Sequence, residues 1–301
     1  MEIRQLKTLI AVVDTGTFTK AADKLFLSQP TISSHIRSLE SELKSQLFVR
    51  NTKNIEITQR GMDLYETAKH IVMLEEQLSQ KWQTTGFEVI HLCASTIPSG
   101  YILPRIVRQF RRKHKDARFV IEHKDSSQII EAIEKGLYDI GFVGMSAKNE
   151  SIRFTPWCED TLVLITPKDK RFEKFADNGT IPTDELKKLY FVMREAGSAS
   201  GKAAQRVLNT LNINEDELKV VARLNDLESI KNFVASGIGV SIISNRAVAN
   251  PRCDDRLLKF NLSDNNKRRF YIATRKNKAL TSACKEFINF AQNFCGIETE
   301  E

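Results

Sequence analysis

Apolar and polar residues alternate at helical spacing through the first sixty positions of the chain. A first helix is predicted up to the turn signal Asp14-Thr15-Gly16, and a second, short helix is predicted over residues 18–25. A third helix is predicted from Pro30 onward, because proline suits a first helical turn, where an N–H group would have no helical partner. Two short helices joined by a tight turn are typical of a helix-turn-helix.

The third predicted helix has an apolar face, with Ile32 and Ile36, and a polar face of short hydrogen-bonding side chains that could reach base edges and phosphates. Residues 48–58 predict a β-hairpin with a polar tip, which would be the wing of a winged helix-turn-helix. The residues that we expect to contact DNA are Ser28, Gln29, Pro30, Thr31, Ser33, Ser34 and Arg37 on the helix, Arg50 and Lys53 on the wing, and Thr58.

The first sixty residues resemble the DNA-binding domain of the LysR-type transcriptional regulators. The matching positions are Phe18-Thr19-Lys20-Ala21-Ala22, Leu25, Ser28-Gln29-Pro30-Thr31-Ile32-Ser33, Ile36-Arg37, Leu39-Glu40, Leu43, Leu47-Phe48, Arg50, and Thr58 with Gly61. Two positions depart from the family pattern: Lys44 stands where a glycine usually closes the helix, and Arg60 replaces a small residue. A left-handed cap at Lys44 would be strained by roughly 1 kcal/mol.

A long linker helix is predicted from residue 59 to about residue 83. Its apolar residues are Leu64, Ala68, Ile71, Leu78 and Trp82, with Glu75 as an interruption. Steps of three and four residues suit a dimerising seam between two chains, and packing against its own domain is the alternative interpretation. Thr84-Thr85-Gly86 ends the helix, so the predicted domains are 1–58 (DNA-binding), 59–86 (linker) and 87–301.

Strands and helices alternate through the rest of the chain, which predicts an α/β architecture. Here the resemblance to the family's effector domain continues, so that the match spans nearly the entire chain. It implies two Rossmann-like lobes, similar to periplasmic binding proteins, with a ligand cleft between them. We expect lobe I to comprise residues 87–161 and 268–301, and lobe II residues 162–267. The resemblance further implies binding to double-stranded operator DNA and assembly into a homodimer and a tetramer.

Two predicted strand-to-helix connections are rich in hydroxyl groups, at residues 95–100 and 194–201, and a third begins at Asp125. Hydroxyls and backbone N–H groups at a helix N-terminus favour an anion, and an arginine adds a fixed positive charge. Helix capping alone is the alternative for any single hydroxyl. The expected ligand-binding residues are Ser95, Thr96, Ser99, Ser126, Arg194, Ser198 and Ser200.

Three stretches of the effector region resemble one branch of the family, the regulators of sulfur, selenium and carbon-fixation genes. They are Ala94-Ser95-Thr96-Ile97-Pro98 before Tyr101-Ile102-Leu103-Pro104, Asp139-Ile140-Gly141-Phe142-Val143-Gly144, and Arg194-Glu195 before Gly197-Ser198. Effectors in that branch are small anions. Ser200-Gly201-Lys202 departs from the branch's usual Gly-Thr-Arg. We therefore expect a sulfur oxyanion or a small carboxylate as effector, and no cofactor.

The amino-acid composition of the chain limits the classes of protein to which it can belong. The chain of 301 residues is 41% hydrophobic and 28% charged, as in folded globular proteins. It has no apolar run near the roughly 20 residues that span a bilayer and no secretory signal, so a cytoplasmic protein without a membrane partner is expected. The net charge of +7 suggests a polyanionic partner, but the densest basic runs, 105–118 and 267–278, lie outside the first sixty residues. Such a run is more often a solvated face.

Five scattered cysteines without a C-x-x-C pair predict reduced thiols and no zinc site. A nucleotide-dependent enzyme is the main alternative class, because Gly197-Ser198-Ala199-Ser200-Gly201-Lys202-Ala203 is similar to a phosphate loop. The loop has three rather than four residues between its glycines, and Ala203 replaces the required Ser or Thr. We expect no catalytic residue and no metal ligand. A solute-binding transport protein is disfavoured by the additional N-terminal domain.

Overall fold

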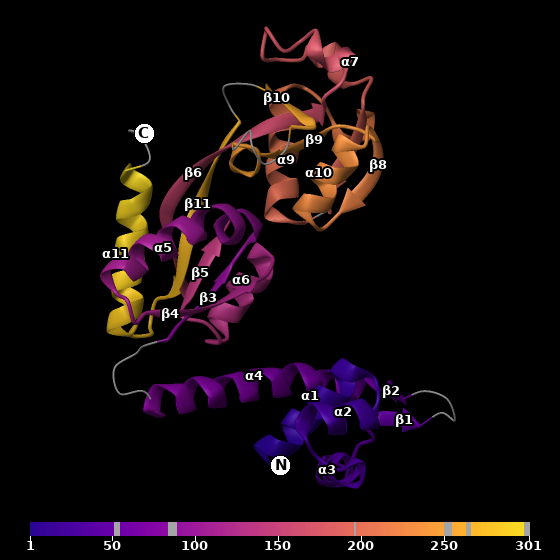
Figure 1. The fold of residues 1–301 in the computed structure, drawn as a ribbon, viewed down its shortest axis with the longest axis vertical. Helices are drawn as coiled ribbons and strands as arrows, with labels where there is room; N and C mark the ends of the chain where they lie inside the picture. Colours follow the sequence, from indigo (N-terminus) through magenta and orange to yellow (C-terminus); the bar gives the residue numbers. More distant parts are fainter. Residues whose placement is uncertain (51–54, 84–88, 196, 250–254, 263–265, 298–301) are drawn as a thin grey trace. The chain divides into compact units, whose positions relative to one another are not determined.

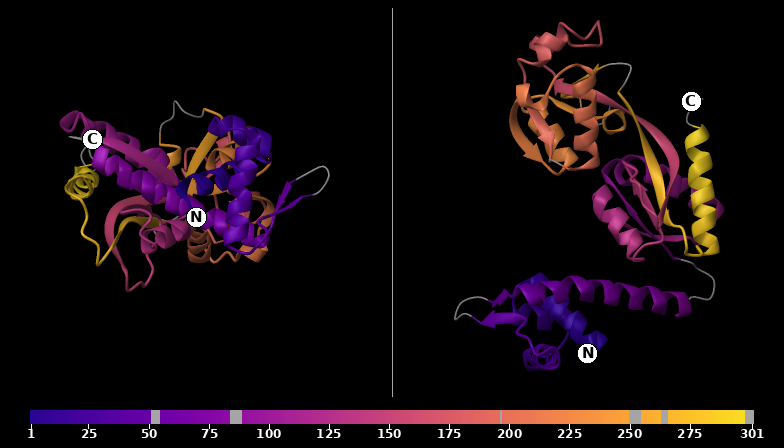
Figure 2. Two further views of the ribbon diagram at one scale, coloured as in Figure 1. Left: turned by 90° about the horizontal axis from the view of Figure 1, so that it is seen from below. Right: turned by 180° about the vertical axis from the view of Figure 1, so that it is seen from behind.

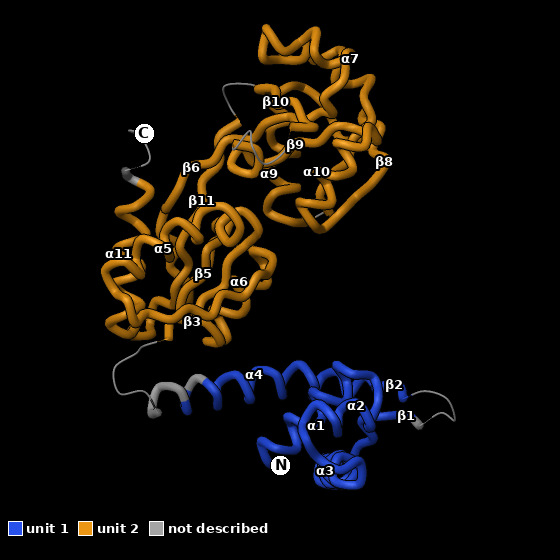
Figure 3. Tube along the Cα trace, in the orientation of Figure 1, with its two compact units in different colours: residues 1–86 blue, residues 87–301 orange. Residues whose placement is uncertain are grey.

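The computed structural model describes the chain except for residues 51–54, 84–88, 196, 250–254, 263–265 and 298–301. The chain forms two compact units, Met1–Gly86 and Phe87–Glu301 (Figure 3). Each unit is described by itself below.

The first unit is a small helical domain with a two-stranded hairpin (Figure 1). Its elements are α1 (Ile3–Thr15), α2 (Phe18–Leu25), α3 (Gln29–Glu42), β1 (Phe48–Arg50), β2 (Ile55–Ile57) and α4 (Gln59–Gln83). The apolar faces of the helices meet in one core that includes Leu9, Ile32 and Leu39, each with no exposed surface. This order confirms the predicted helix-turn-helix followed by a wing and a long helix.

Local signals in the sequence explain where these helices begin and end. The side chain of Thr17 caps α2 by accepting a hydrogen bond from Lys20 N at 3.1 Å. After α3, Lys44 adopts the left-handed conformation, with φ of +49°, despite the strain expected there. Phe26, in the turn between α2 and α3, is also left-handed, with φ of +54°. Residues other than glycine adopt the left-handed backbone conformation at a cost in free energy. The packing of the helices around the two turns therefore sets their conformation.

The linker helix α4 divides into two parts by burial. Ala68 is fully buried in the core of its own domain, and Leu64 and Ile71 pack against that core, as the alternative interpretation expected. Leu74 and Leu78 are 45% and 58% exposed. Leu74 and Leu78 are therefore open to a second chain. Within the described residues, no helix is both long and apolar enough to cross a membrane.

The second unit contains the predicted alternation of strands and helices. Its first half comprises β3 (Val89–Ala94), the π-helical turn η1 (Pro98–Ile102), α5 (Leu103–Lys113), β4 (Arg118–His123), α6 (Ser126–Glu134), β5 (Ile140–Val143) and β6 (Ile152–Pro167). Its second half comprises α7 (Lys170–Glu173), α8 (Thr183–Leu186), β7 (Tyr190–Arg194), α9 (Ala199–Thr210), η2 (Glu215–Glu217), β8 (Lys219–Leu224), α10 (Leu227–Ala235), β9 (Ser241–Ser244), η3 (Asn245–Ala247), β10 (Leu257–Asn261), β11 (Lys267–Arg275) and α11 (Ser282–Ile297).

Two long antiparallel strands, β6 and β11, connect the lobes (Figures 1 and 2). In lobe I, β11 pairs with β5, and β3 lies parallel to both β5 and β4. In lobe II, β6 pairs with β9 and β10, while β7 lies parallel to β8. β6 and β11 therefore pass from one lobe to the other.

The structure differs from the sequence-based expectations at several elements. β6 runs from Ile152 to Pro167 and therefore crosses the expected boundary between lobe I and lobe II after residue 161. The elements α7, α8 and β10 are not predicted. Residues 95–100 are predicted as a connecting loop, yet they continue into η1. Short or irregular elements carry too few residues for a periodic pattern.

The expectation of five reduced thiols is wrong for one pair. Cys158 on β6 and Cys295 on α11 form a disulfide, with their Cα atoms 5.6 Å apart, a usual separation for such a bond. Because 137 positions separate them, no local spacing could indicate the pairing. Cys93 and Cys284 are buried thiols, and Cys253 lies outside the described residues.

Candidate nucleic-acid interface and anion cleft

The beginning of α3 is fixed by Ser28 and Pro30. The Ser28 hydroxyl accepts a hydrogen bond from Thr31 N at 3.3 Å and lies 2.8 Å from the Thr31 hydroxyl, while Pro30 occupies the first turn. Capping of this kind stabilises the helix start and sets its direction. The predicted base-contacting side chains Gln29, Ser34 and Arg37 are exposed on this helix, as are Ser28 and Pro30. Thr31 and Ser33 are half-buried.

The opposite face of α3 is held by apolar contacts and one polar contact. Ile32 and Ile36 are buried in the domain core. His35 Nδ1 lies 2.8 Å from the hydroxyl of Thr8, a fully buried residue of α1. His35 therefore positions α3 against α1. The polar residues face away from the core.

The wing and its surroundings are described in part. β1 and β2 pair with Arg50 opposite Ile55, and Lys53 lies outside the described residues. The Thr58 hydroxyl donates to Gln46 O at 2.9 Å and accepts from Gly61 N at 3.0 Å. Thr58 thus caps α4 and ties it to the chain before the wing. A Cβ atom at Gly61 would collide with the backbone of Leu47, which explains the glycine there.

A narrow cleft in the second unit contains six of the seven side chains predicted to bind an anion. They are Ser95, Thr96, Ser126, Arg194, Ser198 and Ser200. Ser99 is not among the residues of the cleft; its backbone N–H donates to Ser95 O at 2.9 Å. The cleft also contains Arg268 and Phe270 of β11. It encloses about 10 Å³, which is space for about one water molecule.

Arg268 lines the cleft but is not among the residues predicted to bind the ligand. Its Nε donates to Asp160 Oδ2 at 2.7 Å, and its Nη1 donates to the Ser200 hydroxyl at 3.2 Å. Asp160 is fully buried and also accepts a hydrogen bond from the Ser244 hydroxyl at 2.7 Å. Burial lowers the pKa of Arg268 and the adjacent Asp160 carboxylate opposes this, so the side chain stays charged. The available signal was the alternation of Arg268, Phe270 and Ile272 with Lys267, Arg269 and Tyr271 along β11, which places the first three on one face of the strand.

Two guanidinium groups in the cleft have a buried N–H that lacks a partner among the described residues. Arg194 Nη2 pairs with Glu195 Oε1 at 2.8 Å, but its Nε has no partner. Arg268 Nη2 is likewise unpaired. Each arginine is 7% exposed. A buried donor without an acceptor is costly, so the cleft is suited to a group that supplies acceptors.

Three further hydroxyl groups of the cleft have partners within the chain. Ser198 caps α9 by accepting from Gly201 N at 3.0 Å, and Ser126 accepts from Gly144 N at 3.0 Å. The Thr96 hydroxyl lies 3.2 Å from Nε2 of His123. The capping interpretation therefore holds for Ser198. Among the described residues of the cleft, the fully buried side-chain donors without a partner are Arg194 Nε and Arg268 Nη2.

A hydrogen bond also joins the lobes beside this cleft. The Tyr101 hydroxyl at the end of η1 donates to Glu228 Oε1 of α10 at 2.7 Å. Lys231 Nζ, which is almost completely buried, holds both oxygens of the same carboxylate at 3.0 Å. With Arg268 and Ser200, this contact keeps the lobes together in the structure.

Two family models match most of the chain. Residues 3–62 match the bacterial regulatory helix-turn-helix protein, lysR family, and residues 87–296 match the LysR substrate binding domain. The chain therefore belongs to the LysR family. It is a DNA-binding transcriptional regulator with an effector-binding domain.

Individual relatives agree with this membership. An "uncharacterized HTH-type transcriptional regulator" of Methanocaldococcus jannaschii is 32% identical over 246 residues, which cover 81% of this chain and 82% of that protein. A "probable RuBisCO transcriptional regulator" of Cyanidium caldarium is 30% identical over 250 residues, covering 81% and 78%. The crystal structure of full-length CbnR complexed with its target DNA has a TM-score of 0.80 at 20% identity, covering 97% and 99%. That likeness confirms the predicted fold class.

Proposed function

We propose that the exposed face of α3 reads the operator and that the interlobe cleft holds the effector as a small anion. On α3, the buried Ile32 and Ile36 fix the helix while Arg37 is exposed. A guanidinium in this position can form two hydrogen bonds to a guanine edge. On the wing, Arg50 and Lys53 contact phosphates, which supply affinity without sequence preference.

The anionic character of the effector rests on one observation: Arg194 and Arg268 each bring a buried, unpaired N–H to the same cleft. Carboxylate, sulfate and phosphate oxygens are the acceptors that match a guanidinium in geometry and charge. Both arginines already have one carboxylate partner, Glu195 and Asp160 respectively. An oxyanion with two or more acceptor oxygens would complete both sets of hydrogen bonds.

We infer the class of effector from the branch of the family that the sequence motifs resemble, the regulators of sulfur, selenium and carbon-fixation genes. Relatives named as RuBisCO transcriptional regulators support the carbon-fixation side of that branch. A small carboxylate metabolite and a sulfur oxyanion are the two candidates. The cleft encloses about 10 Å³, so either ligand must separate the lobes in order to enter. Effector binding would then favour a more open lobe arrangement, because a ligand shifts an equilibrium by its differential affinity.

We further propose that the regulator acts in the cytoplasm as a homodimer or tetramer and has no catalytic activity. The exposed Leu74 and Leu78 on α4 offer an apolar seam to a second chain. A change of lobe arrangement in each subunit would alter the spacing of the two α3 helices on DNA, and thereby the bending of the operator.

Isothermal titration with sulfate, thiosulfate and malate tests the effector proposal. We expect Arg194→Gln to weaken binding of the active ligand at least tenfold, while Arg112→Gln, an exposed change on α5 outside the cleft, leaves it unchanged. DNA-binding assays with and without the ligand report whether binding reaches the operator. Equal affinity of the wild type and Arg194→Gln for the active ligand would place the effector elsewhere.

A further inference from the structure

The disulfide between Cys158 and Cys295 joins α11 to β6 at an irregularity in the pairing of β6 with β11. The register shifts by one residue there, so that Trp157 and Cys158 of β6 stand against Phe270 alone on β11. An extra residue of this kind forms a β-bulge, which bends the strand and interrupts its ladder of hydrogen bonds. The disulfide thus attaches α11 to an irregular point of the strand pair that passes from one lobe to the other.

Other contacts hold α11 against the sheet independently of the disulfide. Trp157 Nε1 donates to Ala291 O at 2.9 Å, and Phe287 and Ala291 have no exposed surface. These contacts lie a turn or more before Cys295 on the helix, since one turn spans about 3.6 residues. Cleavage of the disulfide therefore frees the last turn of α11 and leaves the rest of the helix in place.

The two bridged cysteines differ in exposure. Cys158 is 1% exposed, whereas Cys295 is half-buried near the end of α11. The thiols of Cys93 and Cys284 are both buried, and burial raises the pKa of Cys93 well above its ordinary value, so that it stays protonated. Among these four cysteines, a thiolate from solution therefore has access to Cys295.

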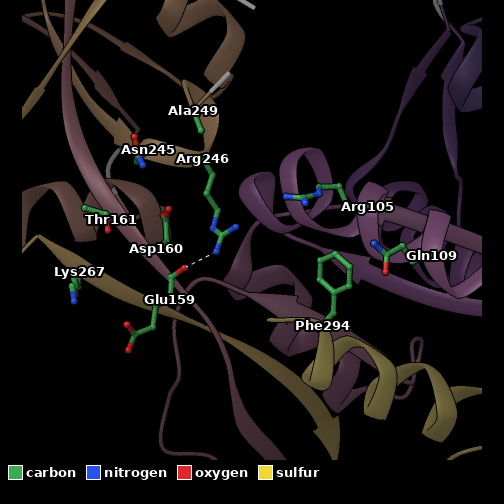
Figure 4. Close-up of a pocket in the computed structure, with 10 residues that line it drawn as sticks. All are labelled: Arg105, Gln109, Glu159, Asp160, Thr161, Asn245, Arg246, Ala249, Lys267 and Phe294. Carbon is green, nitrogen blue, oxygen red and sulfur yellow. Dashed lines mark hydrogen bonds between the residues drawn. The ribbon is translucent and has the colours of Figure 1, made fainter. Parts of the chain in front are cut away.

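The two ends of the disulfide adjoin residues of a large cavity and of the interlobe cleft. Phe294, the residue before Cys295, and Asp160, two residues after Cys158, line one cavity of about 700 Å³ (Figure 4). Asp160 also pairs with Arg268 of the cleft at 2.7 Å. A movement of the last turn of α11 or of the bulge would therefore change the cavity wall and act on the ion pair of the cleft.

We propose that Cys158 and Cys295 form a reversible thiol–disulfide switch. The oxidised form holds the last turn of α11 on the bulge, and the reduced form frees that turn and lets the strand pair bend more readily between the lobes. Disulfides that occur in a reducing cytoplasm are usually transient and serve redox sensing or catalysis. In this respect the proposal rests on the cytoplasmic location proposed above, and it goes beyond effector binding because it needs no ligand in the cleft.

The chemistry is exchange with a dithiol of the kind that keeps cytoplasmic thiols reduced. One thiolate of the dithiol attacks Cys295 Sγ to form a mixed disulfide, the bond to Cys158 Sγ breaks, and Cys158 leaves as a thiolate that takes up a proton. The second thiolate of the dithiol then attacks its own sulfur in the mixed disulfide and releases Cys295, which is protonated in turn. The protein gains two electrons and two protons, and the dithiol becomes a disulfide. Glutathione disulfide reverses the change and yields two molecules of glutathione.

Equilibration of the folded, full-length protein in glutathione buffers, from mostly reduced to mostly oxidised, tests the exchange. The samples are quenched with acid, unfolded and alkylated, and peptide mass spectrometry reports the thiol content at each cysteine. We expect Cys158 and Cys295 to change together from thiol to disulfide across the series, while Cys284 stays a thiol. A pair that stays bridged in the most reducing buffer is a permanent structural disulfide, and a pair that stays reduced in the most oxidising buffer forms no bridge. Either result overturns the proposal.

Hydrogen exchange tests the effect of the bridge on the helix and the strands. We expect the amides of the last turn of α11, and those of β6 and β11 around the bulge, to exchange about tenfold faster in the reduced protein, while β3 and β5 are unchanged. Cys295→Ser should show the fast rate in both buffers. Cys284→Ser, the matched change in the first turn of the same helix, should keep the difference between them.

Equal exchange of the oxidised and reduced proteins overturns the proposal. Faster exchange throughout the second unit also overturns it, because the bridge would then only stabilise the fold as a whole. Neither measurement uses a ligand, so these outcomes are independent of the effector proposal.

Discussion

On α3, the side chains that we assign to DNA come from one short stretch, residues 28–37, and most of them are exposed. In the interlobe cleft, the polar side chains come from segments as far apart as Ser95 and Arg268, and most of them are buried. An exposed side chain can be changed with little effect on the fold, whereas a buried polar group needs its partners. Substitutions on α3 should therefore affect DNA binding alone, and substitutions in the cleft should affect stability as well.

The largest expected effect lies in the cleft, at the ion pair of Asp160 and Arg268. Asp160→Asn leaves a buried arginine without its counter-charge, and we expect the unfolding free energy to fall by about 3 kcal/mol or more. The control is Glu159→Gln, one residue earlier on β6. Glu159 pairs with Arg269 at the neighbouring position of the same two strands, but this ion pair is exposed. Loss of the exposed pair should therefore leave the unfolding midpoint unchanged. Denaturant unfolding measures both, and equal shifts would contradict the distinction between buried and exposed pairs.

On α3 the expected effect concerns DNA and not stability. Arg37→Ala should cost about 1–3 kcal/mol of binding to the preferred operator and relax the preference at one base position. The role of Lys53 rests on the sequence, because the residue lies outside the described part of the chain. Lys53→Ala should weaken binding to all DNA sequences alike and reduce the slope of affinity against salt concentration by about one. Salt-dependent binding to the operator and to a mutated operator separates these roles. A Lys53 variant with changed sequence preference and an unchanged salt slope would reverse the assignment.

The same difference, between a site from one short stretch and a site from distant segments, determines what could be predicted from the sequence. The helix-turn-helix depends on capping, turn and periodicity signals within a few residues, such as Thr17, Ser28 and Pro30, and these local signals set the observed helix starts. The cleft was predicted in part, because Arg194 and Ser198 lie at a strand-to-helix connection. Arg268 lies in a run of basic residues that is more often a solvated face, and only the pairing of β11 with β6 places it beside Asp160.

The disulfide was out of reach for the same reason. Cys158 meets Cys295 only through the packing of two segments that lie 137 positions apart in the chain. Period and spacing describe one segment at a time, so they indicate which face of β6 or α11 is buried but not which residue lies opposite.

Ser198 provides a smaller effect that separates two roles of one hydroxyl. Ser198→Ala changes the side-chain volume little, but it removes the hydroxyl that caps α9. We expect a loss of about 1 kcal/mol in unfolding free energy. The corresponding change on α3, Ser34→Ala, removes an exposed hydroxyl and should leave stability unchanged. Thermal unfolding of the two variants side by side measures this, and equal stability of both would mean that the cap contributes nothing.

The smallest expected effect concerns His91, a half-buried titratable residue that belongs neither to α3 nor to the cleft. His91 on β3 is half-buried, and burial lowers its pKa while Asp139 partly opposes this. Because the folded state then binds a proton less readily than the unfolded state, acidification below the ordinary histidine pKa of about 6.5 protonates the unfolded chain first. Stability is therefore fully present above that pH and declines as the pH falls toward the lowered pKa of the folded protein. We expect the unfolding midpoint of His91→Asn to fall less than that of the wild type between neutral and mildly acidic buffer. Parallel pH profiles for the two proteins would show that another group carries the acid sensitivity of this domain.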